Sequence, residues 1–190
     1  NGYADVIVMR HYEKGAAKVA ADVSSVPIIN AGDGPGDHPT QALLDIYTIH
    51  KEYKKIKNLH IAFVGDLLNG RTANATLQLA RLYPGMTFTF CSTRELAMPH
   101  EYSEGVSYEE VVSLDDVVAT ADVIYMTRIQ KERFASESEY KKHKDDFVLT
   151  RNHLAKIKKK AIIMHPLPRV NEISVEVDGD PRAAYFRQAQ

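Results

Sequence analysis

Five short apolar runs in this chain each stop at a polar cluster, and this repeated pattern most restricts what the chain can fold into. The runs cover residues 6–9, 27–30, 61–64, 123–126 and 161–164. Continuous apolar runs of this length, separated by helix-prone stretches, predict strands of parallel sheet that are buried on both faces. The predicted fold class is therefore α/β, with doubly wound parallel sheets, flanking helices and two lobes.

The best-marked helix is predicted at residues 38–54, where Pro39 suits the first helical position. This helix can join the two lobes, which we expect at residues 1–55, including the linking helix, and at residues 56–190. The first strand starts so near Asn1 that we expect a part of a longer protein, with an incomplete first lobe. The apolar face of the helix is formed by Ala42, Ile46, Ile49, Tyr53 and Ile56.

The composition gives little reason to expect nucleic acid or a membrane surface as a partner, because 24 Lys and Arg balance 25 Asp and Glu. No apolar stretch approaches the roughly 20 residues that a membrane helix needs. The single cysteine, Cys91, excludes an internal disulfide, and we interpret it as a half-buried strand thiol. A reducing, cytoplasmic setting is the corresponding expectation.

The polar clusters that follow the apolar runs should gather at one edge, because ligands bind outside the carboxyl ends of parallel strands. His38 and Gln41 are three residues apart in a first helical turn, where exposed N–H groups attract an anion. Arg71 also falls in a first turn, where a cation is unfavourable by roughly 0.3–1 kcal/mol unless an anion arrives. A histidine that only caps its helix and a solvent-exposed arginine are the alternatives.

A second group of candidates follows the fourth run. Arg128 and Gln130 alternate with Ile129, so their side chains should share one side of the extended chain. Arg71 and Arg128, at adjacent strand ends, suit two carboxylates, because a guanidinium pairs bidentately with each. Arg10, after the first run, is a candidate for a phosphate. These residues predict a small, strongly anionic substrate.

Three further motifs permit narrower interpretations. The rigid segment His165–Pro168 can offer backbone carbonyls to a substrate amide, although a core histidine is the alternative for His165. The glycine-rich residues 32–36 are interpreted as a turn, because their aspartates would repel phosphate. Residues 65–70 lack the G-x-G-x-x-G pattern, and the histidines lack ligand spacing, so we expect neither a nicotinamide cofactor nor a metal.

Taken together, residues 38–41, 65–72, 126–133 and 165–169 resemble the catalytic chain of the aspartate carbamoyltransferase family. The first of these segments is shared with ornithine carbamoyltransferases, whereas the last two are typical of the aspartate branch. Residues 170–188 are most similar to the form fused into the animal multifunctional pyrimidine enzyme.

This resemblance implies transfer of a carbamoyl group from carbamoyl phosphate to the amine of L-aspartate, the committed step of pyrimidine synthesis, without a cofactor. It also implies a homotrimer with shared sites, and phosphate-binding loops and C-terminal helices beyond this chain, which would be inactive alone. The residues implied are Arg10, His38, Gln41, Leu167 and Pro168 for carbamoyl phosphate, with His38 polarising its carbonyl, and Arg71, Arg128 and Gln130 for aspartate.

The chain departs from the family at Leu68-Asn69, where a lysine and an aromatic residue or histidine are usual, and at Ala73-Asn74-Ala75, where Val-His-Ser is usual. Two other functions therefore remain open: an ornithine or related carbamoyltransferase, and a non-catalytic anion-binding or assembly module. The charged residues 131–146 predict either a lid that orders over aspartate or a merely solvated loop.

Overall fold

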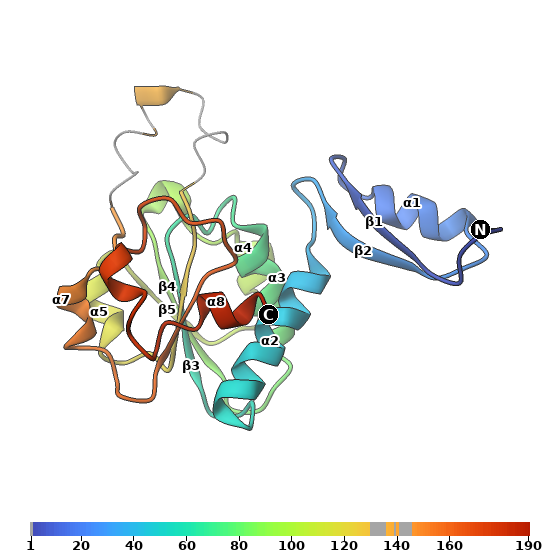
Figure 1. Ribbon diagram of the computed structural model, residues 1–190. Helices are drawn as coiled ribbons and strands as arrows, with labels where there is room; N and C mark the ends of the chain where they lie inside the picture. The colour runs from blue at the N-terminus through green and yellow to red at the C-terminus, as the bar shows by residue number, and fades with distance from the viewer. Residues whose placement is uncertain (1, 130–135, 139, 141–145) are drawn as a thin grey trace.

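Both sheets of the computed structural model are parallel, and the structure describes residues 2–129, 136–138, 140 and 146–190 (Figure 1). The strands are β1 (Ile7–His11), β2 (Ile28–Asp33), β3 (His60–Val64), β4 (Thr87–Cys91), β5 (Tyr108–Val111), β6 (Val123–Met126) and β7 (Ile162–Met164). The helices are α1 (Ala16–Val23), α2 (Pro39–Tyr53), α3 (Arg71–Ala80), α4 (His100–Ser103), α5 (Leu114–Val118), α7 (Arg151–Leu154) and α8 (Tyr185–Gln188), with short 3₁₀ helices η1 (Arg94–Leu96) and η3 (Val175–Val177). All five apolar runs therefore form strands, which confirms the predicted α/β class.

The larger sheet has the order β5-β4-β3-β6-β7, with every neighbouring pair parallel. Its side chains alternate between two apolar cores: Ile61 and Phe63 face the core shared with α2 and α3, whereas Ala62 and Val64 face the core shared with α5. Burial on both faces explains why the runs in this sheet are apolar throughout. Cys91 belongs to the α5 core and is fully rather than half buried; burial, reinforced by Asp116, raises the pKa of its thiol to about 12.

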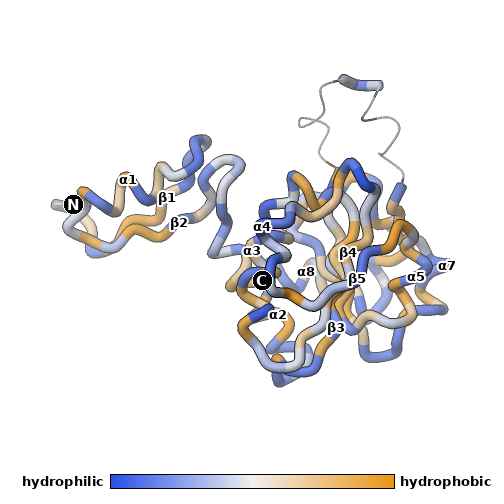
Figure 2. Tube along the Cα trace, turned by 180° about the vertical axis from the view of Figure 1, so that it is seen from behind, coloured by the Kyte–Doolittle hydropathy of each residue, from blue (hydrophilic) through white to orange (hydrophobic). Residues whose placement is uncertain are grey.

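The strands of the first lobe are not buried on both faces, contrary to the expectation from the sequence. Among the described residues, β1 pairs only with β2, and α1 is the only helix of this lobe besides the linking helix. Val8 and Ile29 are 64% and 41% exposed, although Figure 2 shows apolar segments along both strands. One helix covers one face of two strands, so the opposite face of this small sheet stays open among the described residues.

The linking helix α2 packs on the second lobe. Ile46 and Ile49 lie in one apolar core with the strands of the larger sheet. At the end of the helix, the Tyr53 hydroxyl lies 2.8 Å from the carbonyl oxygen of Asp122 and 2.7 Å from that of Lys160. The apolar face predicted for residues 38–54 is confirmed. Packing of this face on the second lobe places His38 and Gln41, at the start of the helix, in the pocket described below.

The sequence pattern does not predict strand β5. β5 lies at the edge of the sheet, and its residues Tyr-Glu-Glu-Val are mostly exposed, so no apolar run marks it. The strand order reverses between β3 and β6, the place where open α/β sheets bind ligands. Within the described part of the chain, no helix combines the length and apolar character needed to cross a membrane.

Candidate functional site

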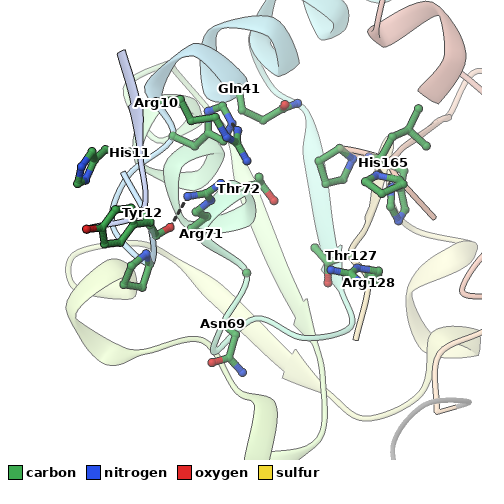
Figure 3. A pocket seen from close by; sticks show the side chains of 17 residues that line it. Arg10, His11, Tyr12, Gln41, Asn69, Arg71, Thr72, Thr127, Arg128 and His165 are labelled. Atoms are coloured by element: carbon green, nitrogen blue, oxygen red, sulfur yellow. Dashed lines mark hydrogen bonds between the residues drawn. The ribbon is translucent and has the colours of Figure 1, made fainter. Parts of the chain in front are cut away.

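A pocket of about 800 Å³ opens between the first lobe and the carboxyl ends of β3, β6 and β7 (Figure 3). This volume is typical of a small-molecule site. Gln130 lies outside the described residues, as does most of the predicted lid at residues 131–146. The predicted site residues that line the pocket are Arg10, His38, Gln41, Arg71, Arg128, Leu167 and Pro168.

Three nitrogen-bearing side chains converge above Gly32. A Cβ atom at this glycine would lie 3.4 Å from Arg71 Nη2, 3.4 Å from His38 Cδ2 and 3.5 Å from Arg10 Nη1. The backbone of Gly32 has a φ of 113°, a value that residues with a side chain rarely adopt. Glycine therefore lets two guanidinium groups and an imidazole approach the backbone of the first lobe, and such a cluster is suited to an anion.

His38 occupies the N-cap position of α2, as the alternative interpretation supposed, but its side chain makes no capping hydrogen bond. Its Nε2 atom lies 3.4 Å from Arg10 Nη1, and this ring nitrogen must accept because a guanidinium can only donate. Burial, Arg71 and Arg10 together lower the pKa of His38 from its ordinary value of 6.5. The imidazole is therefore neutral at pH 7.

Arg71 is the first residue of α3, and its guanidinium donates to the carbonyl oxygen of Gly34 in the first lobe. Figure 3 shows the Arg71 guanidinium on the side of Arg10, and Arg128 on the opposite side, close to Thr127. The two guanidinium groups thus line one pocket from different sides. In this arrangement Arg71 belongs with the first-lobe cluster, and a joint role of Arg71 and Arg128 toward two carboxylates stays a prediction.

The loop after β3 contains the main departure from the family pattern. The Asn69 amide nitrogen lies 3.2 and 3.1 Å from the two carboxylate oxygens of the buried Asp66, and the Asn69 backbone N–H donates to the same carboxylate at 2.9 Å. Asn69 lines the pocket, whereas Leu68 is largely exposed. Gly65 permits a close approach to the next loop, since its Cβ would lie 2.7 Å from the carbonyl oxygen of Thr127.

His165 is a buried histidine with satisfied hydrogen bonds, as the alternative interpretation predicted, yet it also shapes the pocket wall. Its Nδ1 accepts from the N–H of Leu167 at 2.7 Å, so Nε2 carries the proton and donates to Glu172 Oε1 at 2.7 Å. The other Glu172 oxygen accepts the N–H groups of Val170 and Asn171 at 3.1 and 3.0 Å. These bonds hold the segment that brings Leu167 and Pro168 to the pocket.

Replacing Glu172 by glutamine is expected to lower the free energy of unfolding by about 2 kcal/mol, because one amide cannot satisfy all three N–H donors. Burial alone would raise the pKa of Glu172, but hydrogen bonds from His165 and the backbone keep it below the usual 4.5. This stabilisation is present above pH 4.5 and is lost as the pH falls through the lower pKa of the folded state. Urea unfolding at pH 7 and pH 4 tests both statements, and an unchanged midpoint at pH 7 would contradict them.

Asp45 is the residue of this region that the sequence analysis overlooked. It is fully buried on α2, and it lies on the same face as Ala42 and Ile49. An acidic residue within an apolar helical face costs stability unless hydrogen bonds compensate for it, so its position was a detectable signal. Among the described residues, no group of three or more His, Cys, Asp or Glu side chains is placed to hold a metal ion.

The fold and the pocket define an α/β protein with a pocket, lined by arginine and histidine side chains, between two lobes. Residues 1–51 match the carbamoyl-P binding domain, and residues 57–190 the Asp/Orn binding domain, of the aspartate/ornithine carbamoyltransferase family. The chain belongs to this family.

Individual relatives agree with this assignment. The chain is 53% identical to the multifunctional protein CAD of Squalus acanthias, with 99% of the chain and 9% of that protein covered. It is 48% identical to aspartate carbamoyltransferase 2, chloroplastic, of Pisum sativum, covering 100% of the chain and 51% of the relative. It superposes on aspartate transcarbamoylase from Trypanosoma cruzi in complex with carbamoyl phosphate and aspartate, with a TM-score of 0.91, 40% identity and 98% and 63% of the two chains covered. The chain therefore spans less than two thirds of each of these proteins.

Proposed function

We propose that the protein containing this chain transfers the carbamoyl group of carbamoyl phosphate to the amine of L-aspartate, which gives N-carbamoyl-L-aspartate and phosphate. The observation that carries this proposal is the convergence of Arg10, His38 and Arg71 above Gly32, in a pocket whose opposite wall holds Arg128. The names of the relatives, and the carbamoyl phosphate and aspartate in the Trypanosoma cruzi complex, support it.

In the proposed reaction, Arg10 pairs with the phosphate and His38 donates a hydrogen bond to the carbonyl oxygen. The backbone carbonyls of Leu167 and Pro168 accept from the carbamoyl NH₂, as does Gln41. The neutral amine of aspartate attacks the carbonyl carbon, and the new C–N bond forms as the bond from that carbon to the phosphate oxygen breaks. The phosphate leaves with the electron pair of that bond and takes up the proton that the amine loses. Donors aimed at the developing oxyanion contribute about 2.7–4 kcal/mol each in studied enzymes, and the proposed direct transfer uses no covalent nucleophile.

For aspartate we propose Arg128, Arg71 and Gln130 as the carboxylate-binding residues. The backbone at Arg128 is held in place by the preceding residue. The N–H and the hydroxyl of Thr127 both donate to the carbonyl oxygen of Val64 at 2.8 Å. Arg71 reaches the pocket from the first turn of α3, on the side of Arg10, and lines the same pocket as Arg128. It can therefore accompany either anion.

We further propose the division into a carbamoyl-phosphate-binding lobe at residues 1–55 and an aspartate-binding lobe at residues 56–190. By resemblance, the assembly is a homotrimer with sites at its subunit interfaces, which sedimentation of the full-length protein can test: a fully active monomer would contradict it. A cytoplasmic location is proposed on the composition alone, and the Pisum sativum relative is described as chloroplastic.

An assay with both amines tests the proposed function. The full-length protein should carbamoylate aspartate and leave ornithine essentially unused, because two arginines would confront the ornithine side-chain ammonium with like charge. Preferred use of ornithine would overturn the choice of substrate. Tight binding of N-(phosphonacetyl)-L-aspartate without turnover would instead support the non-catalytic module, which the exposed Leu68 favours.

A further inference from the structure

A buried carboxylate lies directly behind the pocket residue Gln41. Asp45 Oδ1 is 2.8 Å from Gln41 Nε2 and 2.5 Å from Gln188 Nε2. Its second oxygen, Oδ2, is 2.6 Å from the hydroxyl of Thr76 and 2.7 Å from the hydroxyl of Tyr125. Asp45 therefore joins α2, α3, β6 and α8 at one point, and none of its side chain is exposed.

The chemistry of these partners fixes the direction of each hydrogen bond. Amide NH₂ groups can only donate, and the two hydroxyls can donate as well, so the carboxylate can accept four bonds when it is ionised. Burial raises the pKa of Asp45 to about 6 against the lowering effect of these hydrogen bonds, so the group is ionised at pH 7 and above. Asp45 Oδ1 thus faces two amide nitrogens.

This arrangement decides which end of the Gln41 amide faces the pocket. The two ends of a glutamine amide are nearly the same size, so hydrogen-bond partners decide between the two orientations. Because Asp45 accepts from Nε2, the Oε1 atom of Gln41 is left for the pocket that Gln41 lines. The pocket-facing group is then an acceptor, which matches an N–H donor on the ligand.

The same carboxylate also supports a second part of the pocket wall. Gln188 donates to Asp45 through Nε2, and its Oε1 accepts the backbone N–H of His165 at 3.0 Å. His165 begins the segment that contains Leu167 and Pro168. One buried anion therefore orients Gln41 and, through Gln188, supports the loop whose carbonyls are proposed to accept from the same NH₂ group.

We propose that Asp45 is a positioning residue that makes the pocket selective for an acyl phosphate bearing an amide NH₂, because it holds Gln41 with its oxygen toward the ligand. This inference rests on the proposed carbamoyl transfer and adds the residue that sets the selectivity for the donor substrate. Asp45 acts through Gln41 and does not touch the substrate itself. What matters at position 45 is an acceptor toward Gln41, rather than the negative charge.

Acetyl phosphate provides the matched probe, because it has a methyl group where carbamoyl phosphate has NH₂. In the full-length Asp45→Leu variant, the ratio of the acetyl phosphate Ki to the carbamoyl phosphate KM should fall about tenfold, since Gln41 can then turn its amide. Asp45→Asn should keep this ratio within about twofold, because its NH₂ can donate to the hydroxyls of Thr76 and Tyr125 while its oxygen still accepts from Gln41.

Thr48→Val is the control on the same helix. It removes a buried hydrogen bond to the carbonyl oxygen of Leu44, 2.8 Å long, without touching Asp45, and should leave the ratio unchanged. The proposal is overturned if Asp45→Leu changes the affinity for both acyl phosphates equally, or if Asp45→Asn loses as much selectivity as Asp45→Leu. A wild-type protein without any carbamoyl transfer would contradict the proposed function instead.

A measurement on the wild-type protein covers the case in which Asp45→Leu does not fold. The side-chain NH₂ protons of Gln41, assigned by NMR from their absence in Gln41→Met, should exchange slowly with solvent because Asp45 holds them. Adding carbamoyl phosphate should leave that exchange slow. Rapid exchange in the free protein, or exchange that becomes slow only on binding, would mean that the NH₂ end faces the pocket and would overturn the proposal.

Discussion

Replacing Arg128 by alanine in the full-length protein is expected to lower kcat/KM for aspartate by about a hundredfold to a thousandfold, the usual result of removing one partner of a desolvated charge pair. Arg128 follows β6, where the strand order of the larger sheet reverses, and it lines the pocket beside Thr127. Its backbone cannot shift easily, because the preceding Thr127 is bound to Val64 and abuts Gly65.

The Arg128→Ala substitution is expected to weaken the use of aspartate but not the binding of carbamoyl phosphate. The Kd of carbamoyl phosphate, measured by calorimetry, should change by no more than about twofold, because the proposed phosphate ligands lie on the opposite side of the pocket. Arg151→Ala offers a matched control, because Arg151 is also an arginine of the second lobe but lies exposed on α7. Wild-type kinetics in Arg128→Ala would refute the aspartate site, and an equal effect in Arg151→Ala would show a general effect of lost charge.

His38→Ala is expected to lower kcat by about a hundredfold to a thousandfold, which is typical for the loss of one donor to an oxyanion. With Nε2 accepting from Arg10, the proton of the neutral imidazole lies on Nδ1, 3.3 Å from the Thr40 hydroxyl. Nε2 can donate to a carbonyl oxygen once Arg10 turns to the phosphate and the proton is carried on Nε2 instead. The KM for aspartate should change far less than kcat, because the proposed aspartate ligands are other residues. Steady-state kinetics at saturating carbamoyl phosphate provide this comparison.

His50→Ala is the corresponding control, because His50 is an exposed histidine in the last turn of the same helix. An NMR titration of the wild-type protein gives an independent check, in which the pKa of His38 should fall below 6.5 because of burial, Arg71 and Arg10. Substituting Arg71 by methionine should raise that pKa toward 6.5. If His38→Ala retains wild-type kcat, the proposed polarisation of the carbonyl is wrong.

The sequence was sufficient to predict the class of fold and seven of the residues that line the pocket, since both depend on local patterns. Runs buried on both faces mark β3, β6 and β7, and the residues that follow parallel strands must gather at one edge. β5 could not be found in this way, because a short exposed edge strand has no apolar signature. The open face of β1 and β2 was also unpredictable, because burial depends on how many elements cover a sheet.

The directions and partners of the side chains also could not be predicted from the sequence. The sequence places Arg71 in the first turn of α3, but a long arginine can reach several partners, and only the structure shows that it donates to Gly34. The position of Asp45 was detectable, but its hydrogen-bond partners were not, for a related reason. Its partners Thr76, Tyr125 and Gln188 come from elements far apart in the sequence, so no spacing along the chain reveals their meeting.

The anchorage of Tyr53 has a mechanical consequence for the two lobes. This side chain holds the far end of α2 to the carbonyl oxygens of Asp122 and Lys160, so the whole helix must move as one rigid body with the larger sheet. We therefore infer that the pivot between the lobes is the stretch 34–37, ahead of the helix, and not the stretch that follows it. His38 would then move with the larger sheet and Arg10 with β1, so a rotation about this stretch would change the 3.4 Å spacing between Arg10 Nη1 and His38 Nε2.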